Sequence, residues 1–296
     1  MIKKRLVLVW LALLLASVSA FAGDAYFTSG GVKLHYTVQG KGEPVILIHG
    51  YAVNIQMNWA ALQPALAQNY QVIALDNRGH GLSEKPTTPD DYGTKFVDDV
   101  IALMDHLKIK KAHVVGYSMG GFITDKLLTT YPERLLTATL GGAGWSHPDD
   151  DPAGFEALAV SLEQGKGLAP LFTFLTPKGE APPTEERIQS MNQMILAFND
   201  PKALAAVARS FPAFAVPEAK LRANKVPTLA LIGEIDPLKA GVDRLDGVMA
   251  NLKIVVIPGA NHMTAFTNPA FVSSLKSFLA EHPAEAGAKA AAAGAK

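Results

Sequence analysis

The fold of this chain is decided by one stretch, Val114-Val115-Gly116-Tyr117-Ser118-Met119-Gly120-Gly121. A mostly apolar run from residue 111 leads into Gly116-x-Ser118-x-Gly120, and residues 122–131 then show helical spacing until Pro132. This is the pattern of a nucleophile elbow, in which a sharp turn from strand to helix lifts a serine hydroxyl clear of a sheet. We expect glycine at 116 and 120 because side chains there would collide where the helix folds back over the strand. The alternative is a loop that happens to carry two glycines, and the flanking strand and helix argue against it.

Strand-like and helix-like segments alternate on both sides of this stretch. The predicted buried strands span residues 44–48, 70–75, 111–117, 135–140, 227–232 and 253–257. The predicted helices span residues 59–68, 92–107, 122–131 and 269–281. A hairpin of residues 25–27 and 32–38 is expected at one edge. Such alternation predicts an α/β fold, a mostly parallel doubly wound sheet with helices on both faces.

The alternation stops between residues 145 and 221. Four short helices are expected there, over residues 156–162, 168–175, 184–198 and 201–210, and no strand. We therefore predict a core of residues 23–144 and 222–284, interrupted by a helical cap insertion at 145–221. Apolar side chains of the insertion either line a pocket or, as is more common, form its own core: Phe155, Leu171, Phe172, Phe174, Leu175, Phe198, Phe211 and Phe214.

The two ends of the chain differ from the rest. Three basic residues at 3–5 precede an apolar run at 6–16, and small residues follow. This predicts a signal peptide at 1–22, cleaved after Ala22 or, as second choice, after Ala20. An uncleaved anchor helix is disfavoured because the run is shorter than the roughly 20 residues that a bilayer span needs. We therefore expect a periplasmic or secreted protein with no stable membrane span after cleavage, and a disordered tail at 285–296.

The composition excludes several classes of function. The chain has 27 basic and 27 acidic residues, and removal of residues 1–22 leaves 24 basic against 27 acidic. No basic stripe is present, which argues against a nucleic-acid partner. The absence of cysteine rules out disulfides and a cysteine nucleophile. Because the sequence shows neither a metal-ligand cluster nor a phosphate-binding loop, we expect no metal and no cofactor.

A serine nucleophile needs a base to take its proton and an acid to orient that base. Among the eight histidines, only His262 lies in the loop directly after the last predicted strand, whereas His282 lies in the tail. Sites in such sheets lie at the carboxyl ends of the strands, so His262 can reach Ser118. Asp236 follows the penultimate strand and fits the chain order serine, acid, histidine. Glu234 is the rival acid, whereas residues 141–144, after the preceding strand, hold no carboxylate.

The reaction also needs backbone N–H donors where negative charge develops. One predicted donor is Met119, directly after the nucleophile and at a helix N-terminus. The second is Tyr51, in the loop after the strand that ends at residue 48. His49 is interpreted as a structural residue that shapes this loop and carries no proton in the reaction.

Taken together, these motifs resemble the α/β-hydrolase superfamily, and specifically its serine-nucleophile, esterase-like branch. The resemblance covers roughly residues 26–281 and rests on His49-Gly50, Asp76-x-Arg78-Gly79-x-Gly81-x-Ser83, Gly116-x-Ser118-x-Gly120-Gly121, Asp236 and His262. It implies that Ser118, Asp236 and His262 form a triad under a cap at 145–221. Relatives that open epoxides or remove halides usually have aspartate at the nucleophile position, so Ser118 counts against both activities. The loop from Asp76 to Ser83 is shared structure in such proteins.

The sequence thus predicts a serine hydrolase that acts on small carboxylic esters, with an apolar acyl part, through an acyl-enzyme. Carbon–carbon bond hydrolysis, lactone hydrolysis and cofactor-free perhydrolysis at the same site remain open alternatives. An alternative of another class is a non-catalytic binding protein with the same fold, and the complete triad argues against it.

Overall fold

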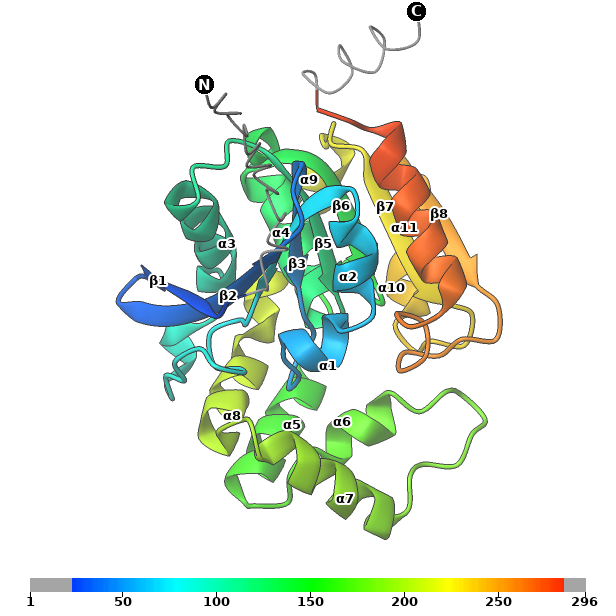
Figure 1. Ribbon diagram of the computed structural model, residues 1–296. Helices are drawn as coiled ribbons and strands as arrows, with labels where there is room; N and C mark the ends of the chain where they lie inside the picture. Colours follow the sequence, from blue (N-terminus) through cyan, green and yellow to red (C-terminus); the bar gives the residue numbers. More distant parts are fainter. Residues whose placement is uncertain (1–22, 285–296) are drawn as a thin grey trace, which may run out of the picture.

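A computed structural model describes residues 23–284, so the predicted signal peptide and the predicted tail lie outside the described residues. Its centre is an eight-stranded sheet with the strand order β1-β2-β4-β3-β5-β6-β7-β8 (Figure 1). Strands β3 to β8 are parallel, and the β1–β2 hairpin pairs antiparallel to β4 through β2. The predicted fold class is therefore confirmed. No helix within residues 23–284 is long and apolar enough to cross a membrane.

The elements follow the chain in alternating order. The strands are β1 Ala25–Ser29, β2 Val32–Gln39, β3 Glu43–Ile48, β4 Tyr70–Leu75, β5 Ala112–Tyr117, β6 Leu135–Gly141, β7 Thr228–Gly233 and β8 Leu252–Ile257. The helices outside the insertion are α1 Ile55–Trp59, α2 Leu62–Ala67, α3 Lys95–His106, α4 Met119–Thr130, α10 Lys239–Asp243 and α11 Pro269–Glu281. The helices of the insertion are α5 Ala153–Glu163, α6 Ala169–Phe174, α7 Glu185–Leu196, α8 Pro201–Ser210 and α9 Glu218–Arg222.

The sheet is buried on both faces because successive side chains of a strand point to opposite sides. In β3, Ile46 and Ile48 belong to one hydrophobic cluster, which includes residues of α3 and α4. Val45 and Leu47 belong to a second cluster, which includes residues of α2 and α11. Figure 1 shows α2 and α11 together on the near face of the sheet. Continuous apolar strands are the consequence of this two-sided burial.

Two of the helices that differ from their predicted bounds do so for local reasons. The helix expected at 59–68 is the shorter α2, and a separate short helix, α1, precedes it and ends at Trp59. Pro64 lies in the first turn of α2, where proline is tolerated because the N–H that it lacks would have no partner within the helix. Helix α3 begins at Lys95 rather than at 92 because Gly93 has a φ of 66°, outside the helical region.

The insertion between β6 and β7 contains helices and no strand within residues 145–221. Its two ends are joined, since Trp145 Nε1 donates to the Val216 carbonyl at 2.7 Å and the Val216 N–H donates to the Ser146 carbonyl at 3.0 Å. Inside it, α5 packs mainly on α8. Figure 1 shows α5 to α8 grouped beyond the edge of the sheet next to α1, which follows β3. The insertion therefore faces the carboxyl ends of the parallel strands.

Candidate active site

The turn from β5 to α4 has the geometry of a nucleophile elbow. Ser118 has a φ of 54° and a ψ of −119°, a backbone conformation that is strained for a residue with a Cβ atom. A Cβ atom at Gly116 would lie 1.9 Å from the Gly120 carbonyl oxygen, where α4 folds back over β5. A Cβ atom at Gly120 would lie 1.9 Å from the Ile48 carbonyl oxygen. The second collision is thus with the neighbouring strand β3, not with the elbow strand as expected.

His262 and Asp236 form a buried pair at the ends of β8 and β7. Nδ1 of His262 lies 2.8 Å from Oδ2 of Asp236, and each residue is 3% exposed. Oδ1 of Asp236 accepts the Leu238 N–H at 2.9 Å, which fixes the carboxylate on its own turn. With the Nδ1–H donated to this carboxylate, the other ring nitrogen, Nε2, is left with a lone pair for a proton.

The pair lies next to the elbow. The Tyr117 hydroxyl donates to the His262 carbonyl at 2.5 Å, and the two rings have centroids 5.3 Å apart. Tyr117 directly precedes Ser118, whose side chain is partly exposed. Among the hydrogen bonds of residues 23–284, none joins Ser118 Oγ to the imidazole, and in free enzymes this contact is often long and shortens with substrate. The structure thus joins Asp236 to His262 directly and places Ser118 beside them.

The rival acid has a different partner. Oε2 of Glu234 accepts the Gly259 N–H at 2.8 Å, in the loop that leads to His262. Glu234 therefore supports this loop, and the imidazole contact belongs to Asp236.

The loop after β3 approaches the elbow closely enough to supply the second N–H donor. A Cβ atom at Gly50 would lie 3.2 Å from the Ser118 Cβ atom. Within the described part of the chain, the N–H groups of Tyr51 and Met119 donate to no protein acceptor. Met119 is the first residue of α4, whose N-terminus carries partial positive charge. Both predicted donors therefore remain available to an oxyanion.

His49 is fully buried under this loop and holds its shape. Its Nε2 accepts the Asn77 N–H at 3.0 Å, so the Nδ1–H must donate to the Gly50 carbonyl at 2.7 Å. Burial lowers the pKa of His49, although the Asp76 carboxylate opposes this shift. The imidazole is thus neutral with both nitrogens engaged, consistent with a structural residue.

The loop from Asp76 to Ser83 is also a framework. Asp76 accepts the N–H groups of Ile55 and Leu82 at 2.9 and 3.0 Å, and its neighbour in the motif, Arg78, forms a buried ion pair with Asp99. These bonds hold the loop in place. Because they engage the side chains of Asp76 and Arg78, we assign neither residue a part in the chemistry.

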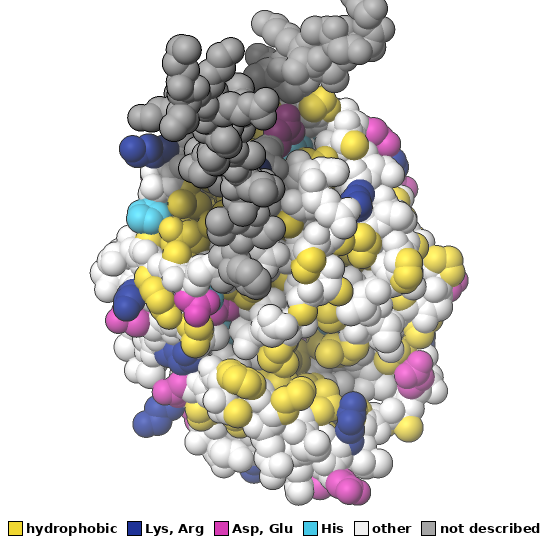
Figure 2. Space-filling view, viewed as in Figure 1, with side chains coloured by type: hydrophobic (Ala, Val, Ile, Leu, Met, Phe, Trp, Pro, Cys, Tyr) yellow, Lys and Arg dark blue, Asp and Glu magenta, His cyan; other side chains and the backbone are white. Residues whose placement is uncertain are grey.

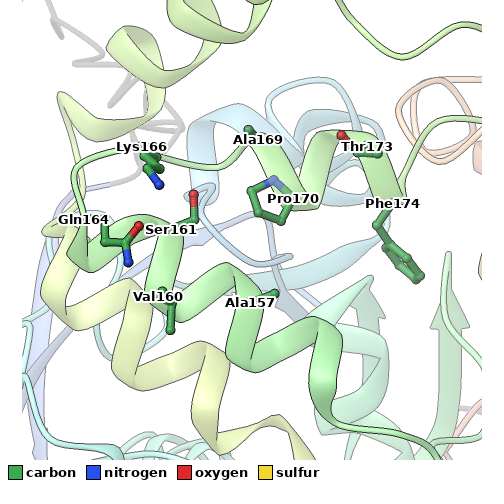
Figure 3. A pocket seen from close by; sticks show the side chains of 9 residues that line it. All are labelled: Ala157, Val160, Ser161, Gln164, Lys166, Ala169, Pro170, Thr173 and Phe174. Carbon is green, nitrogen blue, oxygen red and sulfur yellow. The ribbon is translucent and has the colours of Figure 1, made fainter.

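The apolar side chains of the insertion range from buried to exposed, and Phe155, Leu171 and Leu175 are partly buried. Phe172, Phe211 and Phe214 are buried in the main cluster, whereas Phe174 and Phe198 are 56% and 54% exposed. A cavity of about 660 Å³ lies between α5 and α6 (Figure 3). It is lined by Ala157, Val160, Ser161, Gln164, Lys166, Ala169, Pro170, Thr173 and Phe174. All of these residues belong to the insertion, so this cavity is separate from the elbow and the histidine–aspartate pair.

Three supporting residues were not found from the sequence. Asn58 accepts the Gly50 N–H at 2.9 Å, Tyr117 fixes the His262 backbone, and Asn199 donates to the Ala52 carbonyl at 3.1 Å. Each side chain contacts the backbone of another segment, eight residues away for Asn58 and more than 140 residues away for Tyr117 and Asn199, and none of these contacts produces a spacing pattern in the sequence. Within residues 23–284, no group of three metal-ligating side chains is present.

The sequence matches a known protein family and a characterised relative over most of its length. A family model described as "alpha/beta hydrolase fold" matches residues 43–269. The chain is 30% identical over 276 residues to 2-hydroxymuconate semialdehyde hydrolase of Pseudomonas sp. (strain CF600), covering 87% of this chain and 94% of that protein.

Solved structures resemble the chain over similar lengths. The enol-lactonase from Burkholderia xenovorans LB400 is 26% identical with a TM-score of 0.72, over 86% of this chain and 100% of that chain. The 2-hydroxy-6-oxo-6-phenylhexa-2,4-dienoate hydrolase from Rhodococcus sp. strain RHA1 is 25% identical with a TM-score of 0.68, over 87% of this chain and 98% of that chain. Similar chains therefore carry different hydrolytic activities.

Proposed function

We propose that this chain, a hydrolase that belongs to the α/β-hydrolase fold family, cleaves carboxylic esters through an acyl-enzyme on Ser118. The observation that carries the proposal is the buried contact of 2.8 Å between His262 and Asp236, beside a serine held in the elbow conformation. A serine that needs a base, a base with a free nitrogen and an acid that orients the base are then all present at one edge of the sheet.

The proposed reaction has two steps. Ser118 Oγ attacks the acyl carbon while His262 Nε2 takes its proton, and the oxyanion accepts the N–H groups of Tyr51 and Met119. The imidazolium, stabilised by Asp236, then protonates the leaving alcohol as the ester bond breaks. A water molecule next attacks the acyl-enzyme with His262 as base, which releases the carboxylic acid and restores the serine.

Exposed apolar side chains near this centre support a substrate with an apolar acyl part. Ile235 and Met263, the chain neighbours of the acid and the base, are 41% and 52% exposed. Phe198 is 54% exposed and precedes Asn199, which contacts the loop that carries Tyr51. Water covers these side chains in the absence of substrate, so their burial by an acyl chain would favour binding. In Figure 2, hydrophobic side chains also gather on the lower part of the visible face.

Carbon–carbon bond hydrolysis is the second candidate function. It is favoured by the likeness to 2-hydroxymuconate semialdehyde hydrolase over 87% of this chain. Lactone hydrolysis is a variant of the ester reaction, in which the alcohol and the acyl group stay within one molecule.

A substrate panel with matched variants tests the proposal. Wild type, Ser118→Ala and Ser273→Ala would be assayed on p-nitrophenyl esters of increasing acyl length, on lactones and on a 2-hydroxy-6-oxo-dienoate. Ser273 lies exposed on α11 and serves as the control. Ester turnover should fall by a factor of about 10³ or more in Ser118→Ala alone. Unchanged turnover in Ser118→Ala would overturn the proposal, and cleavage of the dienoate without ester turnover would favour the second candidate.

The proposed compartment is the periplasm or the medium, on the basis of the pattern at residues 1–22. Expression of the full chain followed by cell fractionation and N-terminal sequencing should give an exported protein beginning at Gly23. A cytoplasmic protein that retains Met1 would contradict export.

A further inference from the structure

We infer that Asn199 and the hydroxyl of Tyr51 are positioning residues through which the cap holds the Tyr51 N–H at the oxyanion site. The loop concerned is residues 49–52, called here the oxyanion loop. The inference rests on the proposed function and extends it to the cap, which would then support the reaction as well as cover it.

Hydrogen bonds to the core within residues 23–284 hold the oxyanion loop at its first two residues, and the Tyr51 ring packs on His80 of the core. His49 is bound to the Asn77 backbone, and the Gly50 N–H donates to Asn58 Oδ1 at 2.9 Å. Tyr51 and Ala52 follow, and within residues 23–284 their backbone N–H and carbonyl groups make no hydrogen bond to the core. The half of the loop that carries the proposed donor therefore needs support from elsewhere.

That support comes from the cap, at one short segment before and within the start of α8. Asn199 Nδ2 donates to the Ala52 carbonyl at 3.1 Å, and the Tyr51 hydroxyl donates to the Leu204 carbonyl at 2.8 Å. Both side chains are buried, at 7% exposure each. The segment 199–204 thus contacts two consecutive residues of the oxyanion loop.

The backbone conformation of the loop shows why two contacts are needed. Ala52 has a φ of 61°, in the left-handed region that disfavours residues with a Cβ atom, and it is 1% exposed. Such a conformation persists only where surrounding contacts impose it. If the contacts to Asn199 and Leu204 are removed, we expect Ala52 to relax and the Tyr51 N–H to turn away from the developing oxyanion.

This arrangement predicts a specific kinetic effect. An N–H donor to an oxyanion strengthens its bond as charge develops, so its misplacement lowers kcat more than it weakens substrate binding. A contact that only attached the cap to the core would instead change stability or KM. A fall in kcat with little change in KM therefore indicates a positioning role, whereas a change in KM or stability alone indicates a purely structural one.

The experiment compares two variants with two controls on p-nitrophenyl butyrate. The variants are Asn199→Ala and Tyr51→Phe. The control Asn192→Ala removes an amide that accepts the Leu168 N–H within the cap, and Tyr92→Phe removes a hydroxyl that donates to the Pro86 carbonyl. Each protein would also be followed by hydrogen–deuterium exchange of the peptide spanning residues 49–54 and by thermal unfolding.

We expect kcat to fall by about 10-fold in Asn199→Ala and in Tyr51→Phe, a fraction of the loss for a deleted donor, with KM changed by less than about 2-fold. Exchange at residues 49–54 should be faster in both variants and unchanged in both controls. Unchanged exchange, a kcat equal to that of the controls, or a rise in KM alone would overturn the inference. If Ser118→Ala hydrolyses the ester as fast as wild type, the proposed function fails, and exchange by itself then decides whether the cap holds the loop.

Discussion

The edge of the sheet that carries the proposed triad and the cap that faces it are built in different ways. At the edge, Asp236, His262 and Tyr117 are linked by hydrogen bonds of 2.8 and 2.5 Å, and every partner is buried. In the cap, large apolar side chains such as Phe174 and Phe198 are more than half exposed. The side chains at the edge therefore have one defined arrangement, whereas the cap exposes apolar surface that a bound molecule could cover.

This difference matches the two tasks of the proposed reaction. A proton relay needs groups held within hydrogen-bond distance, which a buried network provides. Recognition of an acyl chain needs apolar area that becomes buried only when substrate arrives. We therefore expect changes at the edge to affect every substrate alike, and changes in the cap to affect the choice among substrates.

The largest expected effect comes from the acid at the edge. Asp236→Asn should lower kcat by about 10³-fold or more on every ester, because the imidazole loses the acceptor that fixes its tautomer. Glu234→Gln, two residues away, is the matched control and should keep kcat within about 3-fold of wild type. Steady-state kinetics on short and long esters would measure both. A larger loss in Glu234→Gln than in Asp236→Asn would reverse the assignment of the acid.

The second effect concerns stability. In Gly116→Ala the new Cβ atom would lie 1.9 Å from the Gly120 carbonyl oxygen, so we expect the free energy of unfolding to fall by about 3 kcal/mol or more. In the cap, Gly154→Ala at the start of α5 meets nothing within 4 Å and should stabilise by up to about 1 kcal/mol. Urea unfolding of both variants gives the comparison. Equal stability of the two would show that the elbow is not packed as described.

The third effect is a dependence of stability on pH, caused by a buried carboxyl group in the core. Both carboxylate oxygens of Asp125, on α4, are buried without a hydrogen-bond partner among residues 23–284. Burial raises the pKa of this carboxyl from 3.8 to about 7, and Lys126 opposes the shift. Because the pKa is higher in the folded state, folding retains a proton that the unfolded chain has lost. The free energy of unfolding therefore falls as pH rises from about 4 to about 7.

Asp125→Asn removes this titration, so its stability relative to wild type should rise by about 4 kcal/mol between pH 4 and pH 8, because each pKa unit corresponds to about 1.4 kcal/mol. Unfolding by urea at a series of pH values would measure the trend. Asp125→Leu, which cannot ionise either, should show the same rise. A difference between wild type and both variants that stays constant with pH would contradict the assignment.

The smallest effect is expected in the cap. Phe198→Ala should lower kcat/KM for long acyl chains by about 10-fold and leave short chains unchanged, since one apolar contact contributes 1–3 kcal/mol of discrimination. Phe174→Ala is the control, because Phe174 lines the cavity between α5 and α6, which contains no residue of the core. A loss on all chain lengths alike in Phe198→Ala would mean that the cap does not select substrates in this way.

The same difference explains how much the sequence could predict. Strands such as β3 and β7 are continuous apolar runs, and their order along the chain places residues 118, 236 and 262 at one edge by topology alone. At Gly116 the steric exclusion acts within a few residues, whereas at Gly120 it involves Ile48 of the neighbouring strand β3. These features are local or topological, and for that reason they could be predicted.

Other features depend on contacts between distant residues. The placement of Asn199 against Ala52 joins residues 147 positions apart. A single asparagine before a helix is typical of a turn. No pattern in the sequence therefore indicates that Asn199 contacts Ala52.

The central claim is that Ser118 becomes a nucleophile because His262 takes its proton. Its most direct test is reaction with a fluorophosphonate, followed by intact-mass analysis and peptide mapping of wild type and His262→Ala. We expect one adduct per chain, located on Ser118 in wild type, and no appreciable adduct in His262→Ala. An adduct on another residue, or equal labelling of Ser118 with and without the imidazole, would contradict it.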